Sequence, residues 1–420
     1  MTLLGANEIP RQPARAEAHP RPARRAPDNA VRVLHIAQSV AGGVATFFEE
    51  LAPYQNETFG EANVNFLIPE GGEIHLPHIS PSQIMTFHAT SRRPSDLLKF
   101  GQAARKAVDL LRPNLVHLHS SFAGAVVRAA LFPTRSRPQI VYCPHGWSFG
   151  METGRAAKFV YAAIERLLAR RTNLILVNST SEYELAVQFG LPQHKISRVG
   201  NGIGWAPAPA PRLARRSGPL QVAFVGRHDR QKGLDILLDA IRRFGLQHIH
   251  FHIVGEPVLG RHGDGHFDAR NVTFHGWLPR SETSALLQDM DAVVMPSRWE
   301  AFGLVAIEAM RAGVPVIGSN RGALPEVIKV GGGYTFDIDD ADALGHLLER
   351  LDTEELRRLG RSARHLWERE YVADRMNQLT SEAYQEVLAG TGARSLFWPA
   401  ADSRRPFPQT LSGGKIADAS

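Results

Sequence analysis

The stretch VRVLHIAQSVAGGVATFFEELAPY, residues 31–54, decides the fold. A short apolar run leads through a glycine-containing turn into a helical pattern of apolar residues, which is typical of a parallel strand followed by its covering helix. Similar apolar runs follow at residues 62–68, 115–120, 140–144 and 174–179, with helical patterns at 95–112 and 154–171. The first half of the chain is therefore predicted to be a parallel sheet covered by helices.

The pattern stops at NGIGWAPAPAPRLARRSGP, residues 201–219, which has the Pro, Ala and Arg content of a linker. It then restarts with apolar runs at residues 220–226, 249–255, 271–276, 290–296 and 313–319. We expect an α/β protein with two doubly wound, Rossmann-like parallel-sheet domains that face a central cleft. The predicted segments are a tail 1–30, a domain 31–203, a linker 204–219, a domain 220–375, a returning helix 376–390 and a tail 391–420.

Composition limits the class of protein. The chain has 420 residues, a net charge of +6 and 43% hydrophobic residues, as expected for a globular protein with a large core. Its one cysteine, Cys143, excludes an internal disulfide. The chain shows no apolar run of the ~20 residues that span a bilayer and no secretory signal at its N-terminus. We expect a cytoplasmic protein, with peripheral binding to the inner membrane face left open.

Two cations flank the first turn of the second half. In VGRHDRQKG, Arg227 and Lys232 lie between an apolar run and a helical pattern, with Gly226 and Gly233 allowing a tight backbone. A planar guanidinium and a point-like ammonium at the carboxyl end of a strand suit a diphosphate. A solvated basic loop is the alternative.

Two glutamates flank a later helix start. In SRWEAFGLVAIEAM, Glu300 precedes the helix expected to begin at Phe302 or Gly303, and Glu308 is expected about two turns inside it. The amides near Gly303 would form an anion site, and the Glu308 carboxylate could accept two hydrogen bonds from a ribose diol. An acidic first-turn residue and a surface carboxylate are the alternatives.

These motifs together resemble a known family. PSRWEAFGLVAIEAMRAGVPVIGS resembles the E-x7-E motif of retaining GT-B glycosyltransferases, most closely the large bacterial group usually numbered family 4, or group 1. VGRHDRQKG resembles its diphosphate motif, VGNGI its hinge, CPHGWSF its sugar-site His-Gly and AGGV its N-terminal glycine turn. The resemblance extends from about residue 31 to 388.

The resemblance implies a role for each residue. Arg227 and Lys232 would bind the donor diphosphate, assisted by amides at Gly303 and Leu304. Glu308 would bind the ribose, and Glu300 would orient the sugar. His145 would lie beside the anomeric carbon or the 6-hydroxyl; the catalytic set is then Glu300, His145, Arg227 and Lys232. Trp277 would bind the donor near the base, with a ring in the core as the alternative, and Gly43 would bind donor phosphate. Gly42 and His119 would lie on the acceptor side.

Other ligand signals are set aside. Asp289 and Asp291 form a D-x-D pattern, but GT-B enzymes use basic residues, so neither a metal nor another cofactor is expected. The spacing of AGGVAT is not that of a dinucleotide motif. His117 and His119 alternate along a strand, and packing is as good an explanation as a site. An interleaved aromatic and basic pattern is missing, so nucleic acid is not an expected partner.

Two helical patterns in the first half are basic. Residues 92–112 carry Arg92, Arg93, Lys99, Arg105, Lys106 and Arg112; residues 155–171 carry Arg155, Lys158, Arg166, Arg170 and Arg171 against Glu165. An ordinary solvated face explains them, but docking to anionic lipid also does. An anionic membrane surface is therefore a further candidate partner.

The predicted function is that of a hexosyltransferase. We expect a retaining, metal-independent enzyme that moves a sugar from a nucleotide-diphosphate donor, with a UDP-sugar favoured, to a saccharide or lipid-linked saccharide in surface polysaccharide synthesis. Three alternatives stay open: a GDP-mannose-dependent mannosyltransferase, a GT-B sugar-nucleotide epimerase, and a non-catalytic basic protein that binds nucleotide or membrane.

Overall fold

The computed structural model describes residues 30–40, 42–88, 93–131, 138–206, 218–257 and 269–390. Residues 1–29 and 391–420 of the two predicted tails lie outside this range, as do residues 207–217 of the predicted linker and Arg92 of the basic pattern. In the described part of the chain, none of the helices is long and apolar enough to cross a membrane.

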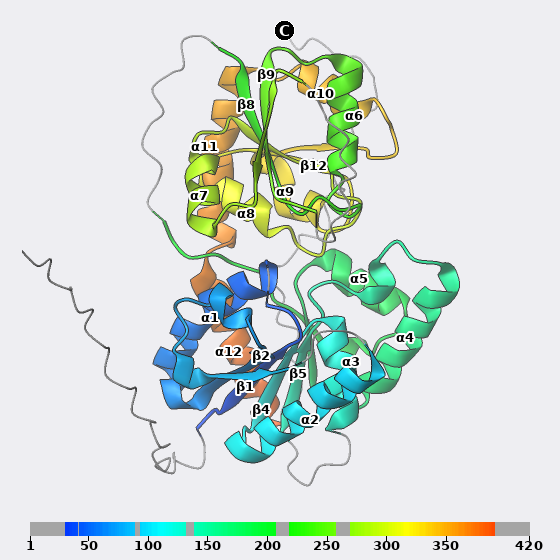
Figure 1. Cartoon of the computed structure of the whole chain (residues 1–420), viewed down its shortest axis with the longest axis vertical. Helices are drawn as coiled ribbons and strands as arrows, with labels where there is room; N and C mark the ends of the chain where they lie inside the picture. The colour runs from blue at the N-terminus through cyan, green and yellow to red at the C-terminus, as the bar shows by residue number, and fades with distance from the viewer. Residues whose placement is uncertain are drawn as a thin grey trace, which may run out of the picture. The chain divides into compact units, whose positions relative to one another are not determined.

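The first sheet has seven strands in the order β3-β2-β1-β4-β5-β6-β7, and every pair is parallel (Figure 1). The strands are β1 (Val33–Ala37), β2 (Val64–Pro69), β3 (Ile84–Phe87), β4 (Leu115–His119), β5 (Gln139–Cys143), β6 (Leu174–Val177) and β7 (Ile196–Arg198). The helices are α1 (Gly43–Phe59), α2 (Pro94–Leu111), α3 (Ser121–Ala130), α4 (Arg155–Ala169) and α5 (Thr180–Gln188). Short 3₁₀ turns lie at Glu61–Asn63, Gly72–His75, Pro81–Gln83, Ser148–Gly150 and Gln193–Lys195.

The second sheet has six parallel strands in the order β10-β9-β8-β11-β12-β13. They are β8 (Leu220–Val225), β9 (Ile249–Val254), β10 (Val272–Gly276), β11 (Ala292–Met295), β12 (Val316–Ser319) and β13 (Gly333–Phe336). The helices are α6 (Leu234–Phe244), α7 (Arg280–Gln288), α8 (Leu304–Arg311), α9 (Leu324–Gly332), α10 (Ala343–Glu349), α11 (Thr353–Glu370) and α12 (Ala373–Ala389). The prediction of two parallel, helix-covered sheets is confirmed.

The apolar pattern does not predict three of these strands, β3, β7 and β13. Each is three or four residues long and lies at the edge of its sheet. An edge strand has one neighbour, so fewer of its side chains need to be apolar than in a central parallel strand. Strand β7, with the sequence ISR, shows how little apolar signal such a strand carries.

Four apolar clusters fill the two faces of each sheet. One face of the first sheet packs against α1 through Phe48 and Leu51, and also against α12 through Met376 and Tyr384. Helix α12, the last described element of the chain, therefore lies beside α1, as its orange colour among the blue elements makes visible (Figure 1).

The chain crosses between the two sheets twice, and the two crossings pair with each other. Ile203 donates its backbone N–H to the Tyr371 carbonyl at 3.0 Å, and its own carbonyl accepts the Ala373 N–H at 3.0 Å. A β-carbon on Gly202 would lie 2.4 Å from the Val372 carbonyl oxygen, so this close pairing requires glycine. The resulting short parallel bridge joins residues that are almost 170 positions apart.

Candidate active site

The topology of each sheet indicates where a ligand would bind. In open α/β sheets, ligands lie beyond the carboxyl ends of the strands at the point where strand order reverses. That point lies between β1 and β4 in the first sheet and between β8 and β11 in the second. The loops after β8 and β11 carry Lys232 and Glu300, and His119 is the last residue of β4.

Lys232 and Glu300 form the central contact of the candidate site. The Lys232 ammonium lies 2.5 Å from Oε2 of Glu300, and the two side chains are 18% and 9% exposed. Lys232 comes from the loop after β8 and Glu300 from the loop after β11, so two neighbouring strands deliver the opposite charges to one place. The hydroxyl of Ser297 lies 3.5 Å from the same carboxylate oxygen.

The backbone of Glu300 is held by a turn that the sequence did not single out. The Glu300 carbonyl accepts the Ala323 N–H at 3.0 Å. Next to Ala323, Gly322 has a left-handed φ of +57°, and a β-carbon there would lie 2.1 Å from the Glu300 carbonyl oxygen. Only glycine fits this approach, and its signal in the sequence is the turn-like run SNRGA after β12.

Arg227 lies on the same loop as Lys232 but is more exposed. Its guanidinium is 47% exposed, lies 3.1 Å from Oδ2 of Asp229 and donates to Oε1 of Gln231 at 2.8 Å. The Gln231 amide donates in turn to the Trp299 carbonyl at 3.2 Å, beside Glu300. The loop after β8 and the loop after β11 are therefore connected directly.

Helix α8 begins immediately after this point. Its N-cap is Gly303, with φ +95° in the left-handed region, and none of the described side chains caps the first turn. These amides and the helix dipole make an anion-binding end. The helix starts at Leu304, so Glu308 lies just over one turn inside it; the prediction of two turns was wrong by about one turn, because 3.6 residues make a turn.

Glu308 lies in a partly buried cluster of charges. Its Oε1 is 3.7 Å from Nε of Arg280 on α7, and Arg280 also contacts Glu50 on α1 at 2.8 Å. Burial raises the pKa of Glu308, while the charges of Arg280 and Arg311 oppose that shift. Arg280 and Glu50 carry no signal in the sequence, because contacts between distant helices leave no local pattern.

His145 occupies a strained position after β5. Its φ of +47° is left-handed, which is uncommon for a residue other than glycine. Its Nε2 lies 3.0 Å from Nδ1 of His119, and its Nδ1 lies 3.3 Å from Nδ2 of Asn178. His119 itself is fully buried and lies behind His145, and burial lowers the pKa of His145 to about 4.

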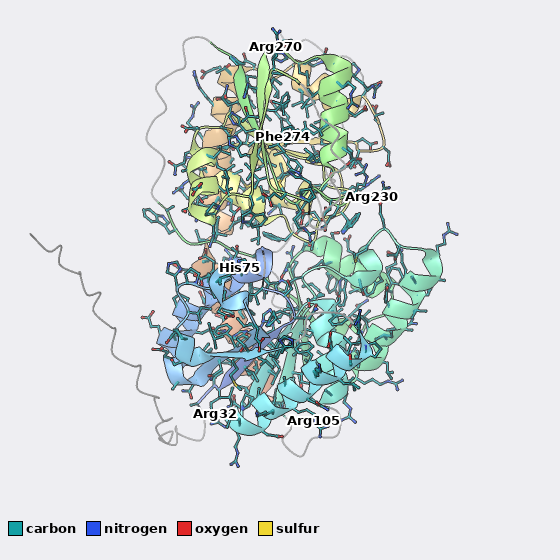
Figure 2. All side chains as sticks on the ribbon, in the orientation of Figure 1. Arg32, His75, Arg105, Arg230, Arg270 and Phe274 are labelled. Carbon is teal, nitrogen blue, oxygen red and sulfur yellow. The ribbon has the colours of Figure 1, made fainter. Side chains whose placement is uncertain are left out.

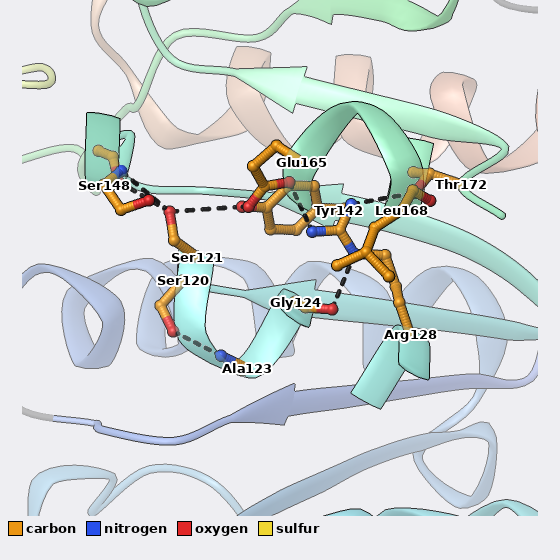
Figure 3. A network of polar contacts seen from close by, with 11 residues as sticks. Ser120, Ser121, Ala123, Gly124, Arg128, Tyr142, Ser148, Glu165, Leu168 and Thr172 are labelled. Carbon is orange, nitrogen blue, oxygen red and sulfur yellow. Dashed lines mark hydrogen bonds and ion pairs between the residues drawn. The ribbon is translucent and has the colours of Figure 1, made fainter. Parts of the chain in front are cut away.

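A buried polar network holds the turn that follows His145 (Figure 3). The Ser121 hydroxyl donates to the Gly146 carbonyl at 3.3 Å and accepts the Ser148 N–H at 3.3 Å. The Tyr142 hydroxyl lies 3.4 Å from Ser121 and donates to Oε1 of Glu165 at 3.0 Å. Ser121 thus holds the turn at Gly146 and Ser148, and Tyr142 connects it to Glu165 on α4, which forms an ion pair with Arg128.

Glycines allow the loops and helix starts that carry the predicted site residues to approach one another. A β-carbon on Gly146 would lie 3.6 Å from Cβ of Ala301, the residue after Glu300. A β-carbon on Gly43 would lie 3.1 Å from Cδ1 of Leu304. Gly42, with φ +67°, has open space around its Cα. The turn after His145, the start of α1 and the start of α8 therefore lie next to one another.

The structure also shows the surroundings of Trp277 and Asp291. Trp277 is 57% exposed, so the alternative that its ring belongs to the core is wrong; its backbone N–H donates to Oε1 of Glu256 at 3.3 Å. Asp291 lies just before β11, at the edge opposite to Glu300, where its carboxylate accepts the Gln221 N–H at 2.8 Å. That contact connects β11 to β8 and gives Asp291 a structural role.

Comparison with known proteins gives the family. Residues 42–202 match the family model described as "Glycosyl transferase 4-like domain", and residues 210–366 match "Glycosyl transferases group 1". An uncharacterised 41.2 kDa protein in the cps region of Klebsiella pneumoniae is 35% identical over 331 residues, which cover 76% of this chain and 89% of that protein.

Two solved structures share the fold. Sucrose-phosphate synthase from Thermosynechococcus elongatus matches with a TM-score of 0.72 and 18% identity, over 85% of this chain and 99% of that one. Alr3699/HepE from Anabaena, solved in complex with UDP and glucose, matches with a TM-score of 0.70 and 20% identity, over 85% and 100%. The predicted GT-B fold and hexosyltransferase class are thereby confirmed, and the chain belongs to the group 1 glycosyltransferases.

Proposed function

We propose that this chain is a retaining, metal-independent glycosyltransferase that transfers a sugar from a nucleotide-diphosphate donor to a saccharide or lipid-linked saccharide acceptor. The observation that carries the proposal is the 2.5 Å contact of Lys232 with Glu300 beside the uncapped N-terminus of α8. A cation and free amides at one place suit a diphosphate, and the neighbouring carboxylate suits the hydroxyls of the sugar attached to it.

The chemistry needs these groups because the reaction separates charge. As the bond to the donor breaks, the anomeric carbon becomes positive and the departing diphosphate becomes negative. Lys232, Arg227 and the amides of α8 would stabilise the negative charge, and preorganised donors of this kind each contribute about 10²–10³ in rate. Because protein cations supply this stabilisation, the proposed mechanism needs no metal ion at the diphosphate.

Glu308 would bind the ribose and His145 would contact the sugar. Glu308 is one turn behind the phosphate-binding end of α8, and a carboxylate there can accept hydrogen bonds from two neighbouring hydroxyls. His145 precedes Gly146, which packs against Ala301 beside Glu300. Glu308 and His145 would thus both contact a donor bound beside Glu300 and the start of α8.

A UDP-sugar is the favoured donor, and surface polysaccharide synthesis is the favoured process. HepE, which shares the fold, was solved with UDP and glucose. The relative from Klebsiella pneumoniae lies in a cps region. These relatives support the proposal by similarity.

A lipid-linked acceptor would be consistent with the surface of α4. Four of its large apolar side chains, Phe159, Val160, Ile164 and Leu167, are between 43% and 64% exposed. Basic side chains lie on the same helix, whereas Glu165 is buried against Arg128 and leaves the exposed face without its negative charge. An amphipathic helix with apolar and basic residues on its exposed side suits an anionic lipid surface.

Helix α2 provides a comparison. Its Arg105 is exposed (Figure 2), as are Leu98 and Leu110, at 68% and 67%. These two leucines are twelve residues apart and do not form a continuous apolar face with i, i+3 and i+4 spacing. We therefore assign membrane docking to α4, not to both basic helices.

The nucleotide is tested by thermal-shift titration of UDP, GDP, ADP and their common sugars, with Glu308→Ala alongside. A ligand at 100 times its dissociation constant adds about 2.7 kcal/mol of stability. We expect the uridine series to stabilise the wild type and to lose this effect in Glu308→Ala. Stabilisation by GDP alone would favour the mannosyltransferase alternative, and stabilisation by none of them would count against a donor site.

Metal independence and membrane docking have separate tests. Transfer to an acceptor should continue after dialysis against EDTA, with retention seen in the anomeric NMR signal of the product. Loss of activity on EDTA treatment, restored by a divalent cation, would refute the metal-independent mechanism. Co-sedimentation with phosphatidylglycerol vesicles should fall in Phe159→Ser/Leu167→Ser and should not change in Leu98→Ser/Leu110→Ser.

A further inference from the structure

A line of hydrogen-bonded side chains runs from His145 into the core of the first sheet. His145 Nε2 lies 3.0 Å from His119 Nδ1, and His119 Nε2 lies 3.1 Å from His35 Nδ1. His35 Nε2 lies 2.8 Å from Oε1 of Gln55 on α1. At the other end, Nδ1 of His145 lies 3.3 Å from Nδ2 of Asn178. Three elements (β4, β1 and α1) and two loops, after β5 and after β6, thus contribute one side chain each.

The contacts of Asn178 determine which atom donates in each of these hydrogen bonds. The Cys143 thiol lies 3.5 Å from Oδ1 of Asn178, and burial raises the pKa of this thiol, so that it keeps its hydrogen and donates. Asn178 therefore accepts through Oδ1, and its Nδ2 donates to His145 Nδ1. His145 must then carry its hydrogen on Nε2.

Each later hydrogen bond follows in the same direction. His145 Nε2–H donates to Nδ1 of His119, whose Nε2–H donates to Nδ1 of His35. His35 Nε2–H donates to Oε1 of Gln55, which only accepts. All three imidazoles have the same tautomer, and each hydrogen bond between His145 and Gln55 has one donor and one acceptor.

The line is neutral around pH 7. Burial lowers the pKa of His35 and of His145 to about 4, and it lowers the pKa of His119 well below its usual value. The rings of Phe47 and Phe48 lie against His119, with ring centres 5.5 and 4.7 Å away. An added proton would place a charge in apolar surroundings and break the order of donors.

We propose that Gln55, His35 and His119 are positioning residues that hold His145 in one neutral tautomer, with Nδ1 as its acceptor and Nε2 directed into the core. The inference rests on the proposed function, because only there does His145 contact the sugar. The left-handed backbone of His145 does not by itself fix the ring, so the hydrogen bonds with His119 and Asn178 determine which nitrogen carries the hydrogen.

A metal ion is the competing occupant of this cluster. One nitrogen from each of His35, His117 and His119 lies within 4.8 Å of the others, which is a spacing that an ion could bridge. However, His35 Nδ1 and His119 Nε2 already share a hydrogen bond at 3.1 Å. An ion would have to replace the hydrogen between them, so the two proposals predict different NMR signals.

Other titratable groups pack against the line. His117 lies beside His119, with ring centres 4.0 Å apart, and its Nδ1 shares a hydrogen bond with the Tyr384 hydroxyl at 2.5 Å. Cys143 faces Asn178, and Glu182 accepts the Asn178 backbone N–H at 2.8 Å. Burial raises the pKa of Glu182 to about 7, so Glu182→Gln is a necessary control in any pH measurement.

The first experiment reads the tautomers without substrate. In protein labelled with ¹⁵N-histidine at pH 7.5, His35, His119 and His145 should each show a protonated Nε2 and an unprotonated Nδ1. Assignment comes from the single variants His35→Gln, His119→Gln and His145→Gln. A protonated Nδ1 at His145, or signals that change on EDTA dialysis, would overturn the proposal.

The second experiment changes the end of the line. Gln55→Glu keeps the acceptor for His35 and adds a negative charge, which should raise the acid limb of the kcat–pH profile by about 1–3 pH units. Gln55→Met removes the acceptor and should lower kcat. Stabilisation by UDP should be unchanged in both, because Arg227, Lys232 and Glu308, which are assigned to the nucleotide, belong to the second sheet and its helices.

The outcomes separate this proposal from the proposed function. If no donor and acceptor react, the proposed function fails, but the tautomers are still measured by NMR. If the wild type is active and Gln55→Glu contains an imidazolium at pH 5.5 while its acid limb stays unchanged, the positioning role is wrong. The Glu182→Gln control should leave the effect of Gln55→Glu intact.

Discussion

Lys232 is the residue on which the proposed chemistry depends most. We expect Lys232→Ala to lower kcat by about 10²–10³, because the lost charge acts on the departing diphosphate. The melting temperature should also fall, because Glu300, 9% exposed, loses its ion-pair partner, but the protein should still fold. Initial rates and a thermal scan check this. Lys99→Ala is the matched control, since Lys99 is 60% exposed on α2 and pairs with Asp96 at 3.8 Å. Full activity in Lys232→Ala would exclude its assignment to the diphosphate.

Gly322 should matter for activity as much as for stability. In Gly322→Ala, both the left-handed φ and a contact 2.1 Å from the Glu300 carbonyl oxygen must be relieved, so Glu300 should shift. Gly245→Ala is the control, because Gly245 has φ +72° with open space and should cost only about 1–2 kcal/mol of backbone strain. We expect kcat to fall in Gly322→Ala and not in Gly245→Ala, as measured by initial rates of both variants at saturating donor.

At this scale the sequence shows single motif residues but not their distant partners. Glu300, Glu308, Arg227 and Lys232 could be selected because each belongs to a local pattern of glycine, strand end and helix start. Arg280, which contacts Glu308, and Gln55, which ends the histidine line, belong to no such pattern. Their contacts depend on which helix lies beside which strand, and that is decided by packing.

At the scale of elements, central strands are easy to predict and edge strands are not. The strand β4, with sequence LVHLH, is apolar enough to identify, but the pairing of His35 with His117 follows only from the order of strands in the sheet. The sequence pattern of α4 gives a wrong position for one side chain. Glu165 reads as a surface charge, but the helix turns it inward against Arg128.

The ion pair of Arg128 and Glu165 joins α3 to α4 in the core (Figure 3). The guanidinium is fully buried, lies 2.7 Å from Glu165 and stacks 4.0 Å from the centre of the Tyr142 ring. Arg128→Met should cost about 3–5 kcal/mol, because it leaves a buried carboxylate without its partner.

Urea unfolding measures this cost. The double variant Arg128→Met/Glu165→Leu should be less destabilised than Arg128→Met alone, because it removes the unpaired charge as well. If the double variant loses the sum of two large single effects, packing and not charge pairing dominates the site.

At the scale of the whole molecule, the buried histidines make stability depend on pH. Burial lowers the folded-state pKa of His35, His117, His119 and His145 below 6.5, so between about pH 4 and 6.5 the unfolded chain binds more protons. The free energy of unfolding therefore falls as the pH is lowered through this range, and these histidines do not reduce it above about pH 6.5. Glu182 opposes this, because its pKa is raised to about 7.

A single variant isolates one histidine. We expect His117→Phe to reduce the slope of unfolding free energy against pH, between pH 4.5 and 6.5, by up to about 1.4 kcal/mol per pH unit. Urea unfolding at several pH values gives the slope. The exposed residue His346 provides the control variant His346→Gln. An unchanged slope in His117→Phe would show that His117 is not held neutral.

Helix α12 determines the order in which the protein can be completed during synthesis. Its Met376, Ala383 and Tyr384 fill the face of the first sheet beside α1, and Tyr384 reaches His117. These residues are synthesised after the strands of both sheets, so the first sheet lacks part of its core until α12 has been made. Until then the nascent first sheet exposes an apolar face, a natural binding site for chaperones. The core of the first sheet is therefore complete only after α12 has been synthesised.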